Sequence, residues 1–265
     1  MSNIKLKKSL GQNFLQDNNI IDKIINVTDI KDKTVLEIGP GDGALSSKLI
    51  KQVNNLICIE LDNQLIPLLE DKFKDYDNFN LIHQDFLKVD PLTFKKYNNI
   101  KVIANLPYYI TSKIINKILI EYPNVDQLVV MVQKEVGLRL TSKPNNKIYG
   151  SLSVFVQTLC DVKYEFSVSK NVFKPVPKVD SAIISFKKKE IDIDIKDYTF
   201  FLKTCFMQKR KTLLNNLSKG YSVDKDTLLT FLEQYNITNN TRAEQLSVEE
   251  FLTLYKNIKE VLWIL

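Results

Sequence analysis

The sequence predicts an α/β protein with a mainly parallel sheet, helices on both of its faces, and a small helical domain at the C-terminal end. Two observations support this prediction. Up to about residue 190, short apolar runs of strand length alternate with amphipathic stretches whose apolar residues recur at helical spacing. Beyond that point, further amphipathic stretches follow one another with no clear strand-like run between them.

Five apolar runs are typical of buried strands, because strands covered on both faces are nearly continuous in hydrophobic residues. They span residues 34–38, 56–60, 80–82, 100–104 and 128–132. The stretches between them, including 44–51, 64–73 and 111–121, have the helical pattern that joins parallel strands. Two later runs, 162–166 and 182–186, are expected to form an antiparallel pair at one edge of the sheet.

A change in composition marks the end of this region. Three lysines at 187–189 precede an alternation of isoleucine and aspartate at 191–194, which is typical of a linker. We therefore predict two domains, residues 1–190 and residues 191–265. Within the second, the patterns predict helices at 198–217, 225–235 and 248–262.

The composition excludes several classes of protein. The chain has 265 residues, of which 44% are hydrophobic and 26% charged, so it is not disordered, and its net charge is only +6. The single histidine, His83, excludes catalytic triads and metal sites that need several imidazoles. The cysteines Cys58, Cys160 and Cys205 are far apart, which argues against a zinc ribbon or a disulfide framework. We therefore expect reduced thiols in a cytoplasmic protein, with no metal and no membrane segment.

A glycine-rich turn follows the first predicted strand. Gly39 and Gly41 lie in the run Glu-Ile-Gly-Pro-Gly-Asp-Gly, residues 37–43, where glycines permit a tight turn and a close approach of the backbone to a ligand. The run lacks the dinucleotide fingerprint and the Walker lysine, and Glu37 would repel a pyrophosphate. A plain turn is the alternative interpretation at this point.

Acidic residues follow the next two strands. Glu60 ends the second strand about 20 residues after the turn, where an acid can accept hydrogen bonds from both ribose hydroxyls of a nucleoside. Asp85 follows the third strand and could accept the amine of an adenine, with Phe86 beside the ring. Either acid alone could be a solvated residue at a strand end. Together with the glycine turn they favour a nucleoside cofactor without phosphate chemistry, which fits S-adenosylmethionine.

The fourth strand ends in Asn105, Leu106, Pro107 and Tyr108, and this turn resembles the motif of methyltransferases that act on adenine N6. The Asn105 side-chain oxygen and the Leu106 carbonyl could accept the two N–H bonds of an adenine amine. That would direct its lone pair, otherwise delocalised into the ring, towards a methyl donor. Pro107 would shape the turn and Tyr108 would stack on the base. The alternative is a simple turn with core aromatic residues.

Several more segments extend the resemblance over essentially the whole chain. Residues 7–15, 132–136, 149–153 and 173–181 are similar to segments of the ribosomal RNA adenine dimethyltransferases. The resemblance implies a seven-stranded, Rossmann-like, S-adenosylmethionine-dependent methyltransferase sheet. It also implies that Asn13 and Leu15 contact the cofactor, and that Phe173 lies across the target base from Tyr108.

The C-terminal residues indicate a branch of this family. Residues 209–217 and 242–247 resemble the helical domain of the bacterial small-subunit dimethyltransferases, which methylate small-subunit ribosomal RNA. We therefore expect N6,N6-dimethylation of two adjacent adenosines in a hairpin loop near the 3′ end of that RNA, within the immature small subunit. The second domain would recognise RNA or the ribosome, and the chain would act as a monomer.

Two rival functions stay open, besides a DNA adenine methylase, which the C-terminal residues disfavour. The first is a large-subunit RNA methylase that confers macrolide resistance, although such enzymes resemble the C-terminal residues poorly. The second is a non-catalytic RNA-binding assembly or transcription factor on the same fold; the complete Asn105–Tyr108 motif argues against it. Lysine clusters at 5–8, 187–189 and 209–211 are compatible with RNA phosphates, but a solvated surface explains any one of them equally well.

Overall fold

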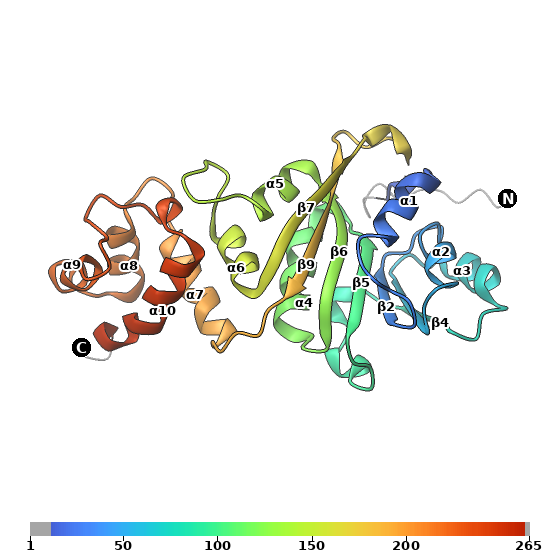
Figure 1. The fold of residues 1–265 in the computed structure, drawn as a ribbon, viewed down its shortest axis with the longest axis horizontal. Helices are drawn as coiled ribbons and strands as arrows, with labels where there is room; N and C mark the ends of the chain where they lie inside the picture. The colour runs from blue at the N-terminus through green and yellow to red at the C-terminus, as the bar shows by residue number, and fades with distance from the viewer. Residues whose placement is uncertain (1–11, 263–265) are drawn as a thin grey trace. The chain divides into compact units, whose positions relative to one another are not determined.

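The structure is a computed structural model that describes residues 12–262. The chain divides into two compact units (Figure 1). The first contains the described residues up to Gly137 together with Val162–Lys188. The second contains Leu138–Asp161 and the described residues from Lys189 onwards.

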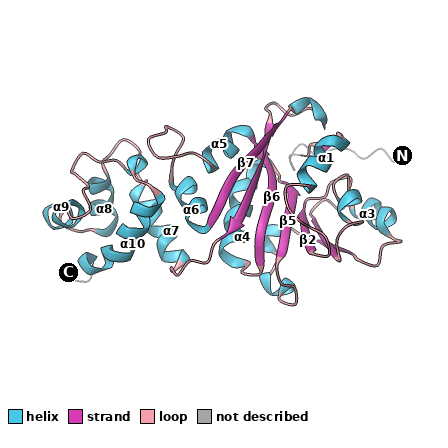
Figure 2. Ribbon diagram, viewed as in Figure 1, coloured by secondary structure: helices cyan, strands magenta, loops and turns pink. Residues whose placement is uncertain are grey.

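The central sheet has seven strands, as predicted (Figure 2). Its order is β4-β3-β2-β5-β6-β9-β7. The bounds are β2 Thr34–Ile38, β3 Asn55–Glu60, β4 Phe79–His83, β5 Ile100–Asn105, β6 Val125–Gln133, β7 Cys160–Val168 and β9 Ser181–Lys188. Strands β2 to β6 pair in parallel, whereas β9 is antiparallel to β6. All seven predicted strands are therefore confirmed, with the last two beside each other at one edge.

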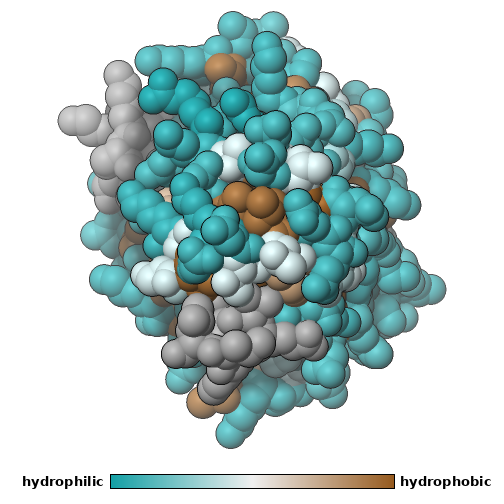
Figure 3. Space-filling model, turned by 90° about the vertical axis from the view of Figure 1, so that its left-hand side faces the viewer, coloured by the Kyte–Doolittle hydropathy of each residue, from teal (hydrophilic) through white to brown (hydrophobic). Residues whose placement is uncertain are grey.

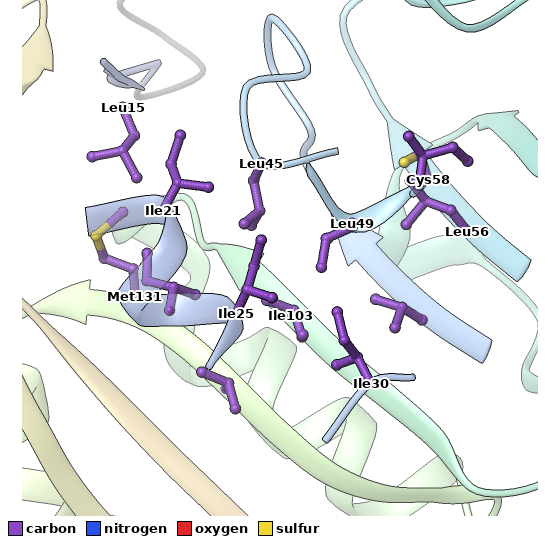
Figure 4. Packing of buried hydrophobic residues seen from close by; sticks show 14 of the residues in the cluster. Leu15, Ile21, Ile25, Ile30, Leu45, Leu49, Leu56, Cys58, Ile103 and Met131 are labelled. Carbon is purple, nitrogen blue, oxygen red and sulfur yellow. The ribbon is translucent and has the colours of Figure 1, made fainter. Parts of the chain in front are cut away.

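Helices cover both faces of this sheet, as the apolar strands predict. On one face, α1 Asn18–Ile25, α2 Ser46–Leu49 and α3 Ile66–Phe73 pack over side chains that alternate along the strands. Figure 4 shows Ile21, Ile25 and Leu45 of this layer close to Ile103 and Met131 of the sheet. Helix α4, Thr111–Glu121, lies on the opposite face (Figure 1), and α5 spans Lys134–Leu140.

A second, two-stranded sheet was not predicted. Strand β1, Phe14–Leu15, is antiparallel to β8, Phe173–Lys174, and pairs Leu15 with Phe173. Asp17 then caps α1, because its Oδ1 accepts hydrogen bonds from the backbone N–H groups of Asn19 and Ile20 at 2.8 and 3.2 Å. The pairing joins two segments far apart in sequence, so no local pattern indicates it.

The second unit is helical. Its helices are α6 Ser151–Leu159, α7 Ile195–Cys205, α8 Leu213–Tyr221, α9 Lys225–Glu233 and α10 Val248–Leu262. The predicted helix at 198–217 was wrong, since α7 and α8 are separate. The break has a physical cause: Thr212 caps the start of α8, and the Asn216 amide donates to the Cys205 carbonyl at 2.8 Å, closing the turn between them.

The division into units differs from the predicted domains in one segment. Residues Leu138–Asp161 group with the C-terminal helices and not with the sheet. The reason is packing, because α6 lies against α7 and α10 and the hydroxyls of Thr158 and Tyr198 are 2.8 Å apart. The predicted domain boundary near residue 190 coincides with Lys189, where the chain re-enters the second unit.

No helix in the described residues is long and apolar enough to cross a membrane. The three cysteines are free and buried, and residues 12–262 contain no cluster of side chains suited to a metal ion. Hydrophilic side chains predominate on the face in Figure 3, with a small hydrophobic group near its middle.

Candidate active site

A cavity opens at the carboxyl ends of the parallel strands in the first unit. Its volume is about 1090 Å³, counting the space at its open mouth. Open α/β sheets bind ligands at this edge. Every predicted site residue except Phe173 lines it: Asn13, Leu15, Gly39, Gly41, Glu60, Asp85, Asn105, Leu106, Pro107 and Tyr108.

The glycine turn forms one wall of the cavity. Gly39, Gly41 and Gly43 have φ values of 68°, 62° and 74°, a conformation that favours glycine. A Cβ on Gly41 would lie 2.8 Å from the ring of Phe14, so the N-terminal segment packs directly on this glycine. On the outside, the Lys72 Nζ donates to the carbonyls of Asp42 and Gly43 at 2.8 and 3.1 Å.

Glu60 connects the glycine turn to the end of β3. Its Oε2 accepts from the Gly41 N–H at 3.2 Å, and its Oε1 accepts from the N–H groups of Leu61 and Asp62 at 2.8 Å each. Burial raises the pKa of this carboxyl, and the three N–H donors act in the opposite direction. The carboxylate is therefore held in one orientation at the cavity, where its oxygens can accept from a ligand.

Glu37 is a cavity residue whose role the sequence did not reveal. It is 2% exposed, and its Oε2 accepts from the Ser46 hydroxyl at 2.5 Å and from the Cys58 thiol at 3.7 Å. Burial raises its pKa to about 7, reinforced by the nearby charges of Glu60 and Asp42. The signal in the sequence was an acid within an otherwise apolar buried strand.

The stability of the protein should therefore depend on pH through Glu37. Its pKa in the unfolded chain is near 4.5, so between pH 4.5 and about 7 the folded state retains a proton that the unfolded state releases. The stabilisation is complete below pH 4.5 and is lost as the pH rises to about 7, a change of about 3 kcal/mol. Urea unfolding of the wild type and of Glu37→Gln at pH 4.5, 6 and 8 measures it. The difference between the two proteins should change with pH by this amount, and a constant difference would contradict the assignment.

Asp85 follows β4 and caps a short 3-10 helix, Phe86–Lys88. One oxygen, Oδ1, accepts from the Leu87 N–H at 3.0 Å, which orients the carboxylate at the cavity wall. Phe86 also lines the cavity, and its ring stacks on Tyr122 with centroids 5.6 Å apart. The acid and the aromatic ring therefore lie at one wall of the cavity.

The Asn105–Tyr108 turn forms the wall beyond β5. The Asn105 Nδ2 donates to the Asn13 carbonyl at 3.0 Å. Because a carbonyl only accepts, the amide nitrogen must face Asn13, which leaves Oδ1 as the acceptor of this side chain. The turn itself is fixed by the Pro107 carbonyl, which accepts from the Ile110 N–H at 3.2 Å and from the Thr111 hydroxyl at 3.0 Å.

Phe173 is the exception among the predicted residues. The expectation that it faces the target base from the other side is not met, because its side chain is 3% exposed, belongs to the hydrophobic core and does not line the cavity. Pairing of β8 with β1 directs Phe173 inward and leaves the next residue, Lys174, exposed. In this structure Phe173 supports the N-terminal segment that covers the cavity.

Comparisons with known proteins give matches over nearly the whole chain. The family model described as ribosomal RNA adenine dimethylase matches residues 3–260. The ribosomal RNA small subunit methyltransferase A of Aster yellows witches'-broom phytoplasma is 44% identical over 255 residues, which cover 94% of each chain. Its counterpart from Bacillus licheniformis is 43% identical over 269 residues, covering 97% of this chain and 92% of the other.

Solved structures show the same fold. A dimethyladenosine transferase from Plasmodium falciparum superposes with a TM-score of 0.82 at 29% identity, covering 94% of this chain and 98% of the other. The 23S rRNA methyltransferase ErmE superposes with a TM-score of 0.72 at 24% identity, covering 93% of this chain and all of the other. At that identity the second likeness concerns the fold alone.

Proposed function

The chain belongs to the ribosomal RNA adenine dimethylase family of S-adenosylmethionine-dependent methyltransferases, and we propose that it dimethylates N6 of two adjacent adenosines in small-subunit ribosomal RNA. The target would be a hairpin loop near the 3′ end of this RNA in the immature small subunit. The observation that carries the proposal is the set of Glu60, Asp85 and the Asn105–Tyr108 turn around one cavity. We also propose that the protein acts as a monomer in the cytoplasm, where such a substrate is assembled.

The residues of the cavity fit S-adenosylmethionine. The chain approaches the cavity closely at Gly41, where a Cβ would collide with Phe14, and Glu60 and Asp85 present carboxylate oxygens without a phosphate-binding lysine motif. Glu60 would accept from the ribose hydroxyls and Asp85 from the adenine amine, while Asn13 and Leu15 would cover the cofactor from the N-terminal segment. When bound, the cofactor supplies a methyl group carried on a sulfonium. Once the methyl group is transferred, the remainder of the cofactor is a neutral thioether.

Asn105 and Leu106 would prepare the target amine for this transfer. The Asn105 Oδ1 and the Leu106 carbonyl would accept its two N–H groups and orient its lone pair, while Tyr108 stacks on the extruded base. The Asn13 carbonyl holds the Asn105 amide in the orientation that this requires. No general base is needed, because the nitrogen becomes cationic when it gains the methyl group, and one of its own N–H protons is then acidic enough to pass to water. Catalysis is then alignment and electrostatic complementarity.

The basic clusters differ in their availability to RNA. At 187–189, the Lys188 Nζ donates to the Tyr122 carbonyl at 2.7 Å, and Lys189 Nζ lies 3.5 Å from an Asp161 oxygen. The Lys188 side chain is therefore held within the fold, whereas Lys189 makes its contact at an exposed position. The loop between α7 and α8 exposes Lys209, Arg210 and Lys211, of which the Lys209 Nζ donates to the Lys147 carbonyl at 3.0 Å. We propose that this loop of the second unit binds phosphates. The cluster at 5–8 lies outside the described residues.

The proposal is tested by substrate choice. The protein is incubated with labelled S-adenosylmethionine and, separately, with unmethylated precursors of small and large ribosomal subunits. We expect N6,N6-dimethyladenosine at two adjacent positions of the small-subunit RNA and none in the large-subunit RNA. Methylation of the large-subunit RNA alone would favour the resistance methylase. Cofactor binding without methylation of either, while a control enzyme methylates the same particles, would favour a non-catalytic assembly factor.

A further inference from the structure

The hydroxyl of Tyr108 forms a hydrogen bond with a buried serine outside the Asn105–Tyr108 turn. The Oη of Tyr108 and the Oγ of Ser181 are 2.6 Å apart, and either can donate. Ser181 is fully buried, with 0% exposure, whereas Tyr108 is partly exposed and lines the cavity. The bond therefore joins a fixed point of the core to the end of an aromatic ring in the site.

Ser181 is held rigidly because it lies in the central sheet. Ser181 begins β9 and lies opposite Gln133 of β6, and β6 in turn pairs Met131 with Asn105 at the end of β5. The residue before Ser181 is also held, since the Asp180 carbonyl accepts from the Lys134 N–H at 3.0 Å. Three adjacent strands thus connect Ser181 to the turn that contains Tyr108.

The turn fixes the Tyr108 side chain at its Cα but does not by itself fix the ring. The backbone of the turn determines the position of the Tyr108 Cα, but the ring can still rotate about two side-chain torsions. A hydrogen bond at the far end of the ring fixes the Oη and so restricts the first torsion, whereas it acts on the second only through the preference of the phenolic O–H to lie in the ring plane. Burial raises the pKa of the Tyr108 hydroxyl, which keeps it protonated and able to bond at neutral pH.

We propose that Ser181 is a positioning residue that holds the Tyr108 ring in the orientation in which it receives the target adenine. This inference rests on the proposed function, because it assumes that Tyr108 stacks on the base. It assigns to the last residue of the 173–181 segment a role that its sequence position does not suggest. Ser181 itself would not touch the substrate.

The test removes the bond from each side in turn. Ser181→Ala removes it from the core, and Tyr108→Phe removes it from the site while keeping a ring that can stack. The matched control is Ser185→Ala, since Ser185 is a buried serine of the same strand whose hydroxyl bonds Glu165 at 2.5 Å. The three variants and the double variant of Ser181 and Tyr108 are compared for kcat, KM for the RNA, Kd for the cofactor and melting temperature.

We expect Ser181→Ala and Tyr108→Phe each to lower kcat/KM for the RNA about tenfold, with an unchanged cofactor Kd. The double variant should lose no more than either single variant, because both remove the same bond. Ser185→Ala should stay within about twofold of wild type. Equal losses in Ser181→Ala and Ser185→Ala, or additive losses in the double variant, would overturn the positioning role. A wild type inactive on ribosomal RNA would overturn the proposed function as well.

Discussion

Replacing Asn105 with alanine is expected to lower kcat for adenine methylation about 100- to 1000-fold, the cost typical of losing one oriented polar group at a reacting centre. The variant removes Oδ1, the oxygen that stays available as an acceptor while Nδ2 donates to the Asn13 carbonyl. Without it, the target amine keeps one N–H unoriented and its lone pair delocalised. Single-turnover methylation of small-subunit precursors measures the effect apart from product release.

A second substitution separates the two roles of this amide. Asn105→Asp keeps an oxygen acceptor but cannot donate to the Asn13 carbonyl, so we expect a smaller loss of kcat together with weaker cofactor binding. The melting temperature of both variants should stay close to that of the wild type, because Asn105 is partly exposed. Retention of more than a tenth of the wild-type kcat by Asn105→Ala would contradict the catalytic role.

Glu60→Ala is expected to raise the Kd for S-adenosylmethionine at least about 100-fold. The substitution removes the acceptor proposed for two ribose hydroxyls, and hydrogen bonds to charged groups contribute about 1.5–3 kcal/mol each. It also leaves the N–H groups of Gly41, Leu61 and Asp62 without their acceptor. The glycine turn thus loses one attachment to β3 and keeps the bond from the Gly39 N–H to the Ile59 carbonyl. Isothermal titration calorimetry with the cofactor measures the change.

Two further variants make this test specific. Glu60→Gln keeps one oxygen acceptor and should bind the cofactor more tightly than the alanine variant but less tightly than the wild type. Glu70→Ala removes an exposed glutamate from α3 of the same unit and should leave the Kd unchanged. An unaltered Kd in Glu60→Ala would show that this carboxylate does not hold the cofactor.

The strands and most of the cavity wall could be predicted because their signals are local. A strand buried on both faces needs apolar residues along its whole length, so residues 34–38 and 100–104 were recognisable without a structure. Polar residues that end such strands meet at one edge of a parallel sheet, which brings Glu60, Asp85 and Asn105 to the same cavity. The helix at 111–121 was also correct to the residue.

The predictions that differ from the structure concern segments whose local sequence pattern is compatible with two structures. Apolar residues lie on both sides of the break within 198–217, whereas Thr212 caps a separate helix that begins at Leu213. Residues 138–161 follow the sheet region in sequence, but α6 within this segment packs with α7 and α10. Such choices depend on which surfaces are available elsewhere in the chain.

The sequence by itself determined the class of fold, the residues at the strand ends and the chemistry that they allow. Only the tertiary structure decided the pairing of β1 with β8, the burial of Phe173, the proton held by Glu37 and the bond between Tyr108 and Ser181. The physical reason is the same in each case. Local propensities act over a few residues, whereas burial, pKa and long-range hydrogen bonds depend on neighbours that only folding brings together.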